Sequence, residues 1–121
     1  MEDPPDLSGL SVAEDFPLDR ILAVLSDPLA VYTVSALSVD ERVPLTDLAD
    51  LVTGWVYADA SQAAGPADRD RIRLLLYHVY LPKLDALDIV EFDAEAQTVV
   101  LREQSADFET ILEWAQGLDA T

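Results

Sequence analysis

The first half of the chain carries apolar residues at helical spacing in three successive stretches. The first stretch places Leu18, Ile21, Leu22 and Leu25 at i, i+3, i+4 and i+7. Asp27-Pro28 is a good start for a second helix, because Asp caps a helix and proline suits its first turn. That helix, Leu29 to about Ser38, is apolar nearly all round and should be buried. A third helix follows a short extended piece at Val43–Leu45; its stripe holds Leu48, Leu51, Val52 and Trp55.

The longest helix is predicted to begin at Asp68, after a loop of small and polar residues at Tyr57–Ala67. Its apolar residues form two faces, which indicates core on one side and a second subunit on the other. One face holds Ile72, Leu75, Leu76 and Val79, and the other holds Leu74, Tyr77, Leu81 and Leu84. Pro82 should kink or break this helix, because proline cannot donate a hydrogen bond to the His78 carbonyl.

A β-hairpin and a last helix complete the pattern. Val90 and Phe92 alternate with acidic residues, Val99 and Leu101 alternate on the return, and the acidic turn Asp93–Ala96 joins the two strands. Ser105 can cap the last helix, which either pairs two subunits or closes the core; the pattern leaves both open. In a dimer its interface would be formed by Phe108, Ile111, Leu112, Trp114 and Ala115.

This order of elements predicts a mainly α protein with a small β-hairpin wing (α+β), a winged helix-turn-helix. We expect a flexible acidic arm at residues 1–17, the winged-helix domain at 18–103 and a C-terminal helix at 104–121. The acidic N-terminus resembles no signal peptide, and no apolar run is long enough to span a membrane, so a cytoplasmic protein is expected.

The charge is the unusual feature of the composition. There are 24 acidic and 7 basic residues, for a formal net charge of -17, and Lys83 is the only lysine. The acids are spread through every segment rather than gathered in one block. An even spread predicts adaptation to very high salt, where the Debye length falls to about 3 Å at 1 M and self-repulsion is screened.

The run LYHVYLPKLDALDIVEFDAEAQTVVL resembles the shared core of a large family of small domains of unknown function from halophilic archaea. With LDRILAVLSDP and VPLTDLADLV, the resemblance spans about residues 18 to 102. It implies a winged-helix, regulator-like module, similar more broadly to repressors of the arsenical-resistance and multidrug-response types. One departure concerns Asp27–Val31, where relatives usually carry a cluster of arginines; its loss puts a DNA contact by the second helix in doubt.

Basic residues concentrate on the longest helix. Arg69, Arg71 and Arg73 lie in its first half and His78 follows, which predicts contacts with phosphates and base edges of DNA. Arg69 and Arg73 share a face, whereas Arg71 points elsewhere. The alternative is local pairing of the arginines with nearby acids and a structural, hydrogen-bonded role for His78.

Other chemistry finds little support. The chain has no cysteine, no phosphate-binding glycine loop and no metal motif, so neither an enzyme nor a metal or cofactor site is expected. Its tyrosines and Trp55 could line a ligand pocket, or be core or dimer contacts. The expected function is a homodimeric, DNA-binding transcriptional regulator. The alternative is a winged helix that has lost DNA binding and contacts a protein partner; the acidic hairpin turn favours this alternative.

Overall fold

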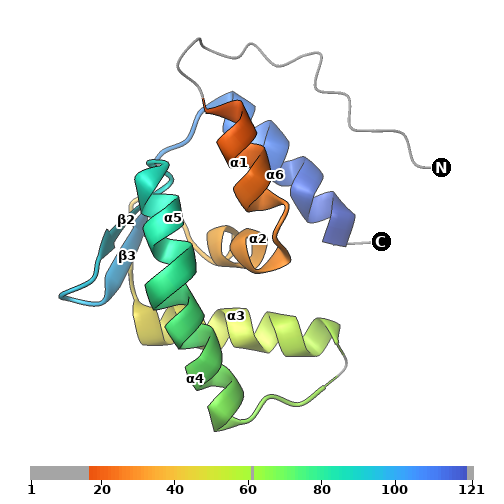
Figure 1. The fold of residues 1–121 in the computed structure, drawn as a ribbon, viewed down its shortest axis with the longest axis vertical. Coiled ribbons are helices and arrows are strands. Elements are labelled where there is room, and N and C mark those ends of the chain that lie inside the picture. The colour runs from red at the N-terminus through yellow and green to blue at the C-terminus, as the bar shows by residue number, and fades with distance from the viewer. Residues whose placement is uncertain (1–16, 61, 120–121) are drawn as a thin grey trace.

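A computed structural model describes residues 17–60 and 62–119. Apart from Pro17, the predicted acidic arm lies outside these residues. The described chain is mainly helical with one small sheet, so the predicted α+β class is confirmed (Figure 1). Its elements are α1 (Leu18–Leu25), α2 (Pro28–Ser35), β1 (Arg42–Pro44), α3 (Leu45–Asp59), α4 (Pro66–Leu75), the π-helical turn η1 (Leu76–Tyr80), α5 (Leu81–Ala86), β2 (Val90–Asp93), β3 (Thr98–Leu101) and α6 (Ala106–Asp119).

The helices enclose one apolar core. α1 and α6 lie side by side and contact each other, α2 contacts α1, α3 and α6, and α4 crosses α3 (Figure 1). The buried cluster draws on every helix and on β2 and β3, and its largest fully buried side chains include Leu25, Leu48, Leu76, Leu84 and Phe108. The expectation that α2 is a buried central helix is confirmed, since Ala30, Val31, Thr33 and Val34 are all buried. None of the described helices is both long and apolar enough to cross a bilayer.

The sheet has three antiparallel strands in the order β1-β3-β2. The predicted hairpin is present, and the short extended piece near Val43 has become its third strand, with Val43 opposite Val99. The Asp93 carboxylate closes the hairpin turn by accepting hydrogen bonds from the backbone N–H groups of Glu95 (3.1 Å) and Ala96 (3.0 Å). An acidic residue at this turn therefore has a structural role, because it satisfies two backbone donors.

Two helix starts follow their predicted capping chemistry. The Asp27 carboxylate accepts a hydrogen bond from the Leu29 N–H (3.0 Å), and Pro28 occupies the first turn of α2. The Ser105 hydroxyl accepts a hydrogen bond from the Phe108 N–H (3.2 Å) at the start of α6. In both cases a short polar side chain satisfies a donor that the helix itself leaves unpaired.

The loop between the third and fourth helices is shorter than predicted. α3 continues to Asp59, and α4 begins at Pro66 rather than at Asp68. Contacts distant in sequence explain the longer α3, since the Tyr32 hydroxyl donates to the Asp59 carboxylate and the Tyr32 and Trp55 rings lie 6.3 Å apart. Pro66 suits a first helical turn because its missing N–H would have no partner there.

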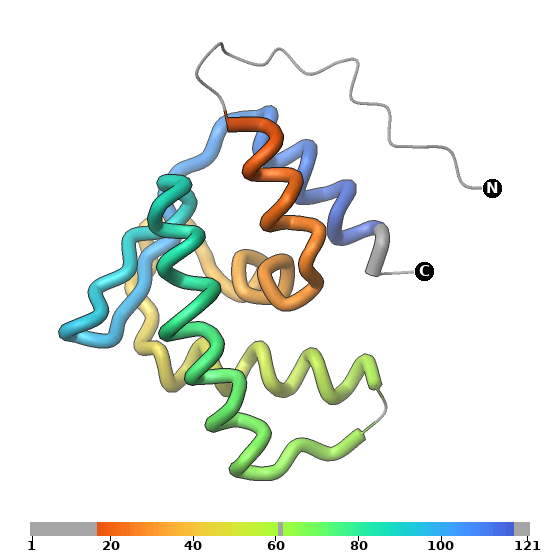
Figure 2. Tube along the Cα trace, viewed as in Figure 1, coloured from red at the N-terminus to blue at the C-terminus, as the bar shows by residue number. Residues whose placement is uncertain are grey.

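The long helix continues through Pro82 instead of breaking there, and α4, η1 and α5 form one uninterrupted helical rod (Figure 2). The turn before the proline is wide: the Leu81 N–H donates to the Leu76 carbonyl, five residues back. A π-turn of this kind accommodates the hydrogen bond that proline cannot make. It also shifts the helical register, so the two predicted faces are wrong: Ile72, Leu76, Leu81 and Leu84 form one buried stripe, while Leu74 is 50% exposed.

Candidate nucleic-acid interface

The start of α4 is fixed by Asp68. The Gly65 N–H donates to the Asp68 carboxylate (2.9 Å), and the Asp68 N–H donates to the Gly65 carbonyl (3.1 Å). The bond from Gly65, a hydrogen bond from the Tyr57 hydroxyl and the nearby Arg71 charge all lower the pKa of Asp68. The hydrogen bond between Tyr57 and Asp68 is also the main cause of the raised pKa of Tyr57. A carboxylate in this position also complements the positive end of the helix.

Arg69 reaches across to α3 and pairs with Asp50. Its guanidinium lies 3.3 Å from the Asp50 carboxylate, and both side chains are about half exposed, at 52% and 54%. An exposed pair of this kind contributes little to stability, about 0.2–1 kcal/mol, and exchanges readily with solvent ions. Arg69 therefore pairs with an acid, as the alternative of local pairing predicted, but the acid is Asp50 on another helix.

Arg69 and Arg73 line one shallow hollow between α3 and α4, of about 260 Å³. Asp50 and Asp70 line the same hollow, so two cations there face two carboxylates. Arg71 is exposed and lies near Tyr57 and Asp68 instead, since its charge acts on the pKa of both. The predicted division of the arginines, with Arg71 apart from the other two, is confirmed.

His78 lies within the wide turn η1 and is exposed. Its ring meets the Tyr77 ring edge-on at 4.7 Å, and the Tyr77 ring in turn meets Phe92 of the hairpin edge-on at 5.7 Å. The His78 ring makes no hydrogen bond to another described residue, so a hydrogen-bonded structural role is not seen. His78 lies seven residues after Arg71, a step that would be two turns of a regular α-helix, but η1 is wider than an α-helix, so the two residues are not in regular helical register.

Three of the five residues expected at a dimer interface are buried in the core of the chain itself. Phe108 and Ala115 are 2% exposed and Ile111 is fully buried, so these side chains close the core and their assignment to a subunit interface is corrected. Leu112 and Trp114 are only partly buried against that core. The centre of the apolar stripe of α6 is thus buried in the core of the monomer, and only the edge of the stripe is accessible.

The aromatic residues do not converge on one pocket. Tyr32 and Trp55 contact each other, Tyr77 packs on Phe92, and Tyr57 bonds to Asp68. Tyr80 is separate from them and donates a hydrogen bond of 2.6 Å to the Asp27 carboxylate. Among the described residues, no group of three or more His, Cys, Asp or Glu side chains is placed to hold a metal ion.

Sequence reasoning missed Asp50 as the partner of Arg69 and Asp27 as the partner of Tyr80. Each pair joins two different helices, at separations of 19 and 53 residues. Asp50 is one of many scattered acids, so no sequence signal singled it out. The sequence identified Asp27 only as a helix cap, a role that uses the carboxylate oxygen accepting from the Leu29 N–H.

The described residues therefore define a small, mainly helical α+β domain, with arginines on α4 and an acidic hairpin that packs on α5. A family model described as "Domain of unknown function (DUF7344)" matches residues 22–100, and the chain belongs to that family. The match covers the second half of α1, all elements from α2 to α5 and nearly all of the hairpin, but not α6. No curated protein and no solved structure matches the chain.

Proposed function

We propose that the protein is a DNA-binding transcriptional regulator with a winged helix-turn-helix fold, acting as a homodimer in a high-salt archaeal cytoplasm. The observation that carries the proposal is the placement of α4. It follows α3 across a short loop, packs against it, and presents Arg69 and Arg71 on exposed positions. In helix-turn-helix proteins the second helix of such a pair enters the major groove with its N-terminal residues at the bases.

The sheet supports the same assignment. The hairpin β2–β3 follows the long helix directly, and β1 joins it from the segment before α3. This order of helices and strands is that of winged-helix regulators. In the proposed complex the hairpin lies along the DNA backbone, and its acidic turn holds it away from the minor groove, where Arg or Lys would be needed.

The acidic surface sets the conditions for binding. Asp50, Asp68 and Asp70 surround the arginines of α4, so phosphate attraction is weak. At high bulk salt, counterion release also contributes little to affinity. The proposed complex therefore depends on base-edge contacts from Arg71 and Arg73, on shape, and on cations held between carboxylates and phosphates.

The proposed dimer uses the accessible edge of α6, with Leu112 and Trp114. A two-fold dimer presents two copies of α4 to successive major grooves, and half-sites one helical turn apart match that symmetry.

The test is the recovery of genomic fragments by the purified protein at about 2 M KCl, where screening keeps an acidic halophilic protein folded. Enrichment of discrete promoter fragments supports the proposal and gives the operator sequence. Absence of enrichment by protein that circular dichroism shows to be folded overturns it.

A protein-interaction module is the second candidate, and one specific observation favours it. Leu51 and Trp55 lie one turn apart on α3 and are 46% and 39% exposed. Exposed apolar side chains at this spacing are typical of helix faces that bind partners. A Leu51→Ser, Trp55→Ser double variant separates the two candidate functions. If the protein is an interaction module, the variant should lose binding to its protein partner; binding to DNA should be retained.

A further inference from the structure

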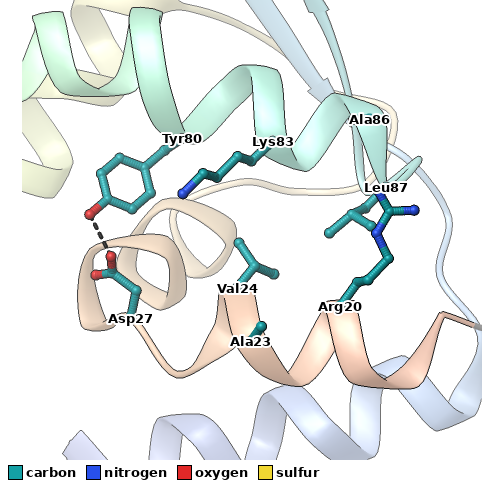
Figure 3. Close-up of a pocket in the computed structure, with 8 residues that line it drawn as sticks. All are labelled: Arg20, Ala23, Val24, Asp27, Tyr80, Lys83, Ala86 and Leu87. Carbon is teal, nitrogen blue, oxygen red and sulfur yellow. Dashed lines mark hydrogen bonds between the residues drawn. The ribbon is translucent and has the colours of Figure 1, made fainter.

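A hollow of about 300 Å³ lies between α1 and α5, on residues that the proposed DNA contacts do not use (Figure 3). Its size is at the lower end of the range for small-molecule sites, about 300–1,000 Å³. The lining residues are Arg20, Ala23, Val24, Asp27, Tyr80, Lys83, Ala86 and Leu87. The walls between the polar groups are apolar, formed by α1 on one side and α5 on the other.

One end of the hollow is closed by the hydrogen bond between Tyr80 and Asp27 (Figure 3). One Asp27 oxygen accepts from the Tyr80 hydroxyl at 2.6 Å, and the other accepts from the Leu29 N–H at 3.0 Å. Burial and this hydrogen bond raise the pKa of Tyr80 to about 12. Tyr80 therefore keeps its proton and directs it at Asp27, so it has no donor left for a ligand.

The two cations of the hollow have no such partner. Arg20 rises from α1 beside Leu87 at one end, and the Lys83 side chain extends along the α5 wall toward Tyr80 (Figure 3). Within the described residues the one ion pair is that of Arg69 with Asp50, so neither cation is paired there. Arg20 and Lys83, which have no ion-pair partner among the described residues, face one carboxylate that already accepts two hydrogen bonds, so the lining carries an excess of positive charge in a chain of net charge -17.

We propose that this hollow binds a small organic acid: one carboxylate carried on an apolar body. The carboxylate pairs with the Arg20 guanidinium at the Leu87 end of the hollow, and the apolar body lies on Ala23, Val24 and Ala86, toward Lys83. Arg20 provides the planar, two-pronged donor set that matches a carboxylate, and Lys83 adds a point charge. The proposal does not rest on DNA binding.

Binding is tested by calorimetric titration of the full chain with two probes, 1-naphthoate and octanoate, at about 2 M KCl. Saturable, one-to-one binding of at least one probe is expected. The uncharged analogues 1-naphthalenemethanol and 1-octanol should bind about tenfold more weakly, because they cannot form the charge-assisted bonds. No saturable binding of either acid, or equal binding of the alcohols, overturns the proposal.

Variants locate the site. Arg20→Gln should weaken binding about fivefold to tenfold, since it removes the charge-assisted contact, and Lys83→Gln should weaken it less, since Lys83 acts on the carboxylate only from the other end of the hollow. Arg102→Gln makes the same change of charge on an exposed residue outside the hollow and should leave binding unchanged. Ala23→Phe fills the apolar floor from an exposed position on α1 and should abolish binding while the circular dichroism spectrum is retained. Equal effects of Arg20→Gln and Arg102→Gln would show general charge attraction and overturn the assignment.

Discussion

Leu76 and Leu81 are five residues apart on one helix, and both side chains are fully buried in the same core. The Leu81 N–H donates to the Leu76 carbonyl, so the extra residue of the π-turn separates them. In a regular α-helix a step of five residues would rotate the second side chain well away from the first. The wide turn thus decides which leucines of the long helix belong to the core.

This register predicts very unequal losses of stability for two leucines that a regular helix would place on one face. Leu81→Ala should lower the free energy of unfolding by about 2–5 kcal/mol, because it empties a buried position. Leu74→Ala, at a position 50% exposed, should change it by less than about 0.5 kcal/mol. Denaturant titration at constant high salt measures both. Similar losses for the two variants would contradict the π-turn register.

The Tyr80–Asp27 hydrogen bond predicts a loss of stability at alkaline pH. The folded state raises the pKa of Tyr80 to about 12, so between the ordinary value of 10.0 and about 12 the unfolded chain loses a proton that the folded chain keeps. The free energy of unfolding therefore falls as pH rises through this window, and below the window the contribution of this group does not change with pH. Tyr80→Phe should cost about 0.5–1.5 kcal/mol at neutral pH and flatten the alkaline decline.

Thermal unfolding monitored from pH 8 to 12 checks this result. Tyr77→Phe is the matched control, since the Tyr77 ring packs on Phe92 while its hydroxyl makes no hydrogen bond to a described residue. An alkaline decline that is equal in wild type and Tyr80→Phe would show that another group causes it.

The proposed DNA contact predicts that Arg71→Ala and Arg73→Ala together abolish retention of enriched fragments. Both side chains lie on α4, at positions exposed or partly exposed, so the melting temperature should be nearly unchanged. Fragment retention and thermal unfolding are measured on the same samples at high salt, with Arg102→Ala as the charge control. Full retention by the double variant would refute the placement of α4 at the bases.

The ion pair between Arg69 and Asp50 predicts a gain of binding. Asp50→Asn removes one negative charge and frees the Arg69 guanidinium, which lies 3.3 Å from Asp50 in the wild type. DNA affinity should rise severalfold, by about 0.5–1 kcal/mol, because an exposed pair costs little to break. Fluorescence anisotropy with an enriched fragment measures the change, and Asp47→Asn, exposed on the same helix, is the control. A weaker complex after Asp50→Asn would mean that Asp50 positions Arg69 for binding.

Because one part of α6 is buried and another is accessible, substitutions on this helix should separate the stability of the monomer from its association into a dimer. Phe108→Ala should cost about 3–5 kcal/mol because Phe108 is 2% exposed in the monomer. Trp114→Gln, at the accessible edge, should convert the proposed dimer to a monomer with a smaller loss of stability. Sedimentation gives the oligomeric state, with Glu113→Gln as control. A dimer that persists in Trp114→Gln places the interface elsewhere.

The elements that were predicted correctly depend on neighbours in sequence. Asp27-Pro28 and Ser105 start helices because capping needs only a side chain and a backbone donor two or three residues away. The hairpin strands follow from alternation over four residues and a short turn. The division of Arg69 and Arg73 from Arg71 likewise follows from helical geometry within one turn.

The errors occur where distant residues compete with the local pattern. α3 runs three residues into its predicted loop as far as Asp59, where Tyr32 of another helix provides a hydrogen-bond partner. The last helix has the stripe expected of a dimer, but the monomer core already buries Phe108 and Ile111. An apolar stripe shows that a face will be covered and does not show by what.

By itself the sequence determined the order of helices and strands, the α+β class and the acidic character, because periodicity, capping and charge are local properties. Only the tertiary structure decided the π-turn at Leu76–Tyr80, the pairing of Arg69 with Asp50, and the hollow between α1 and α5. Each of these depends on which side chains from different elements the fold brings together. Burial energy, summed over many distant contacts, outweighs the preference of any one helical turn.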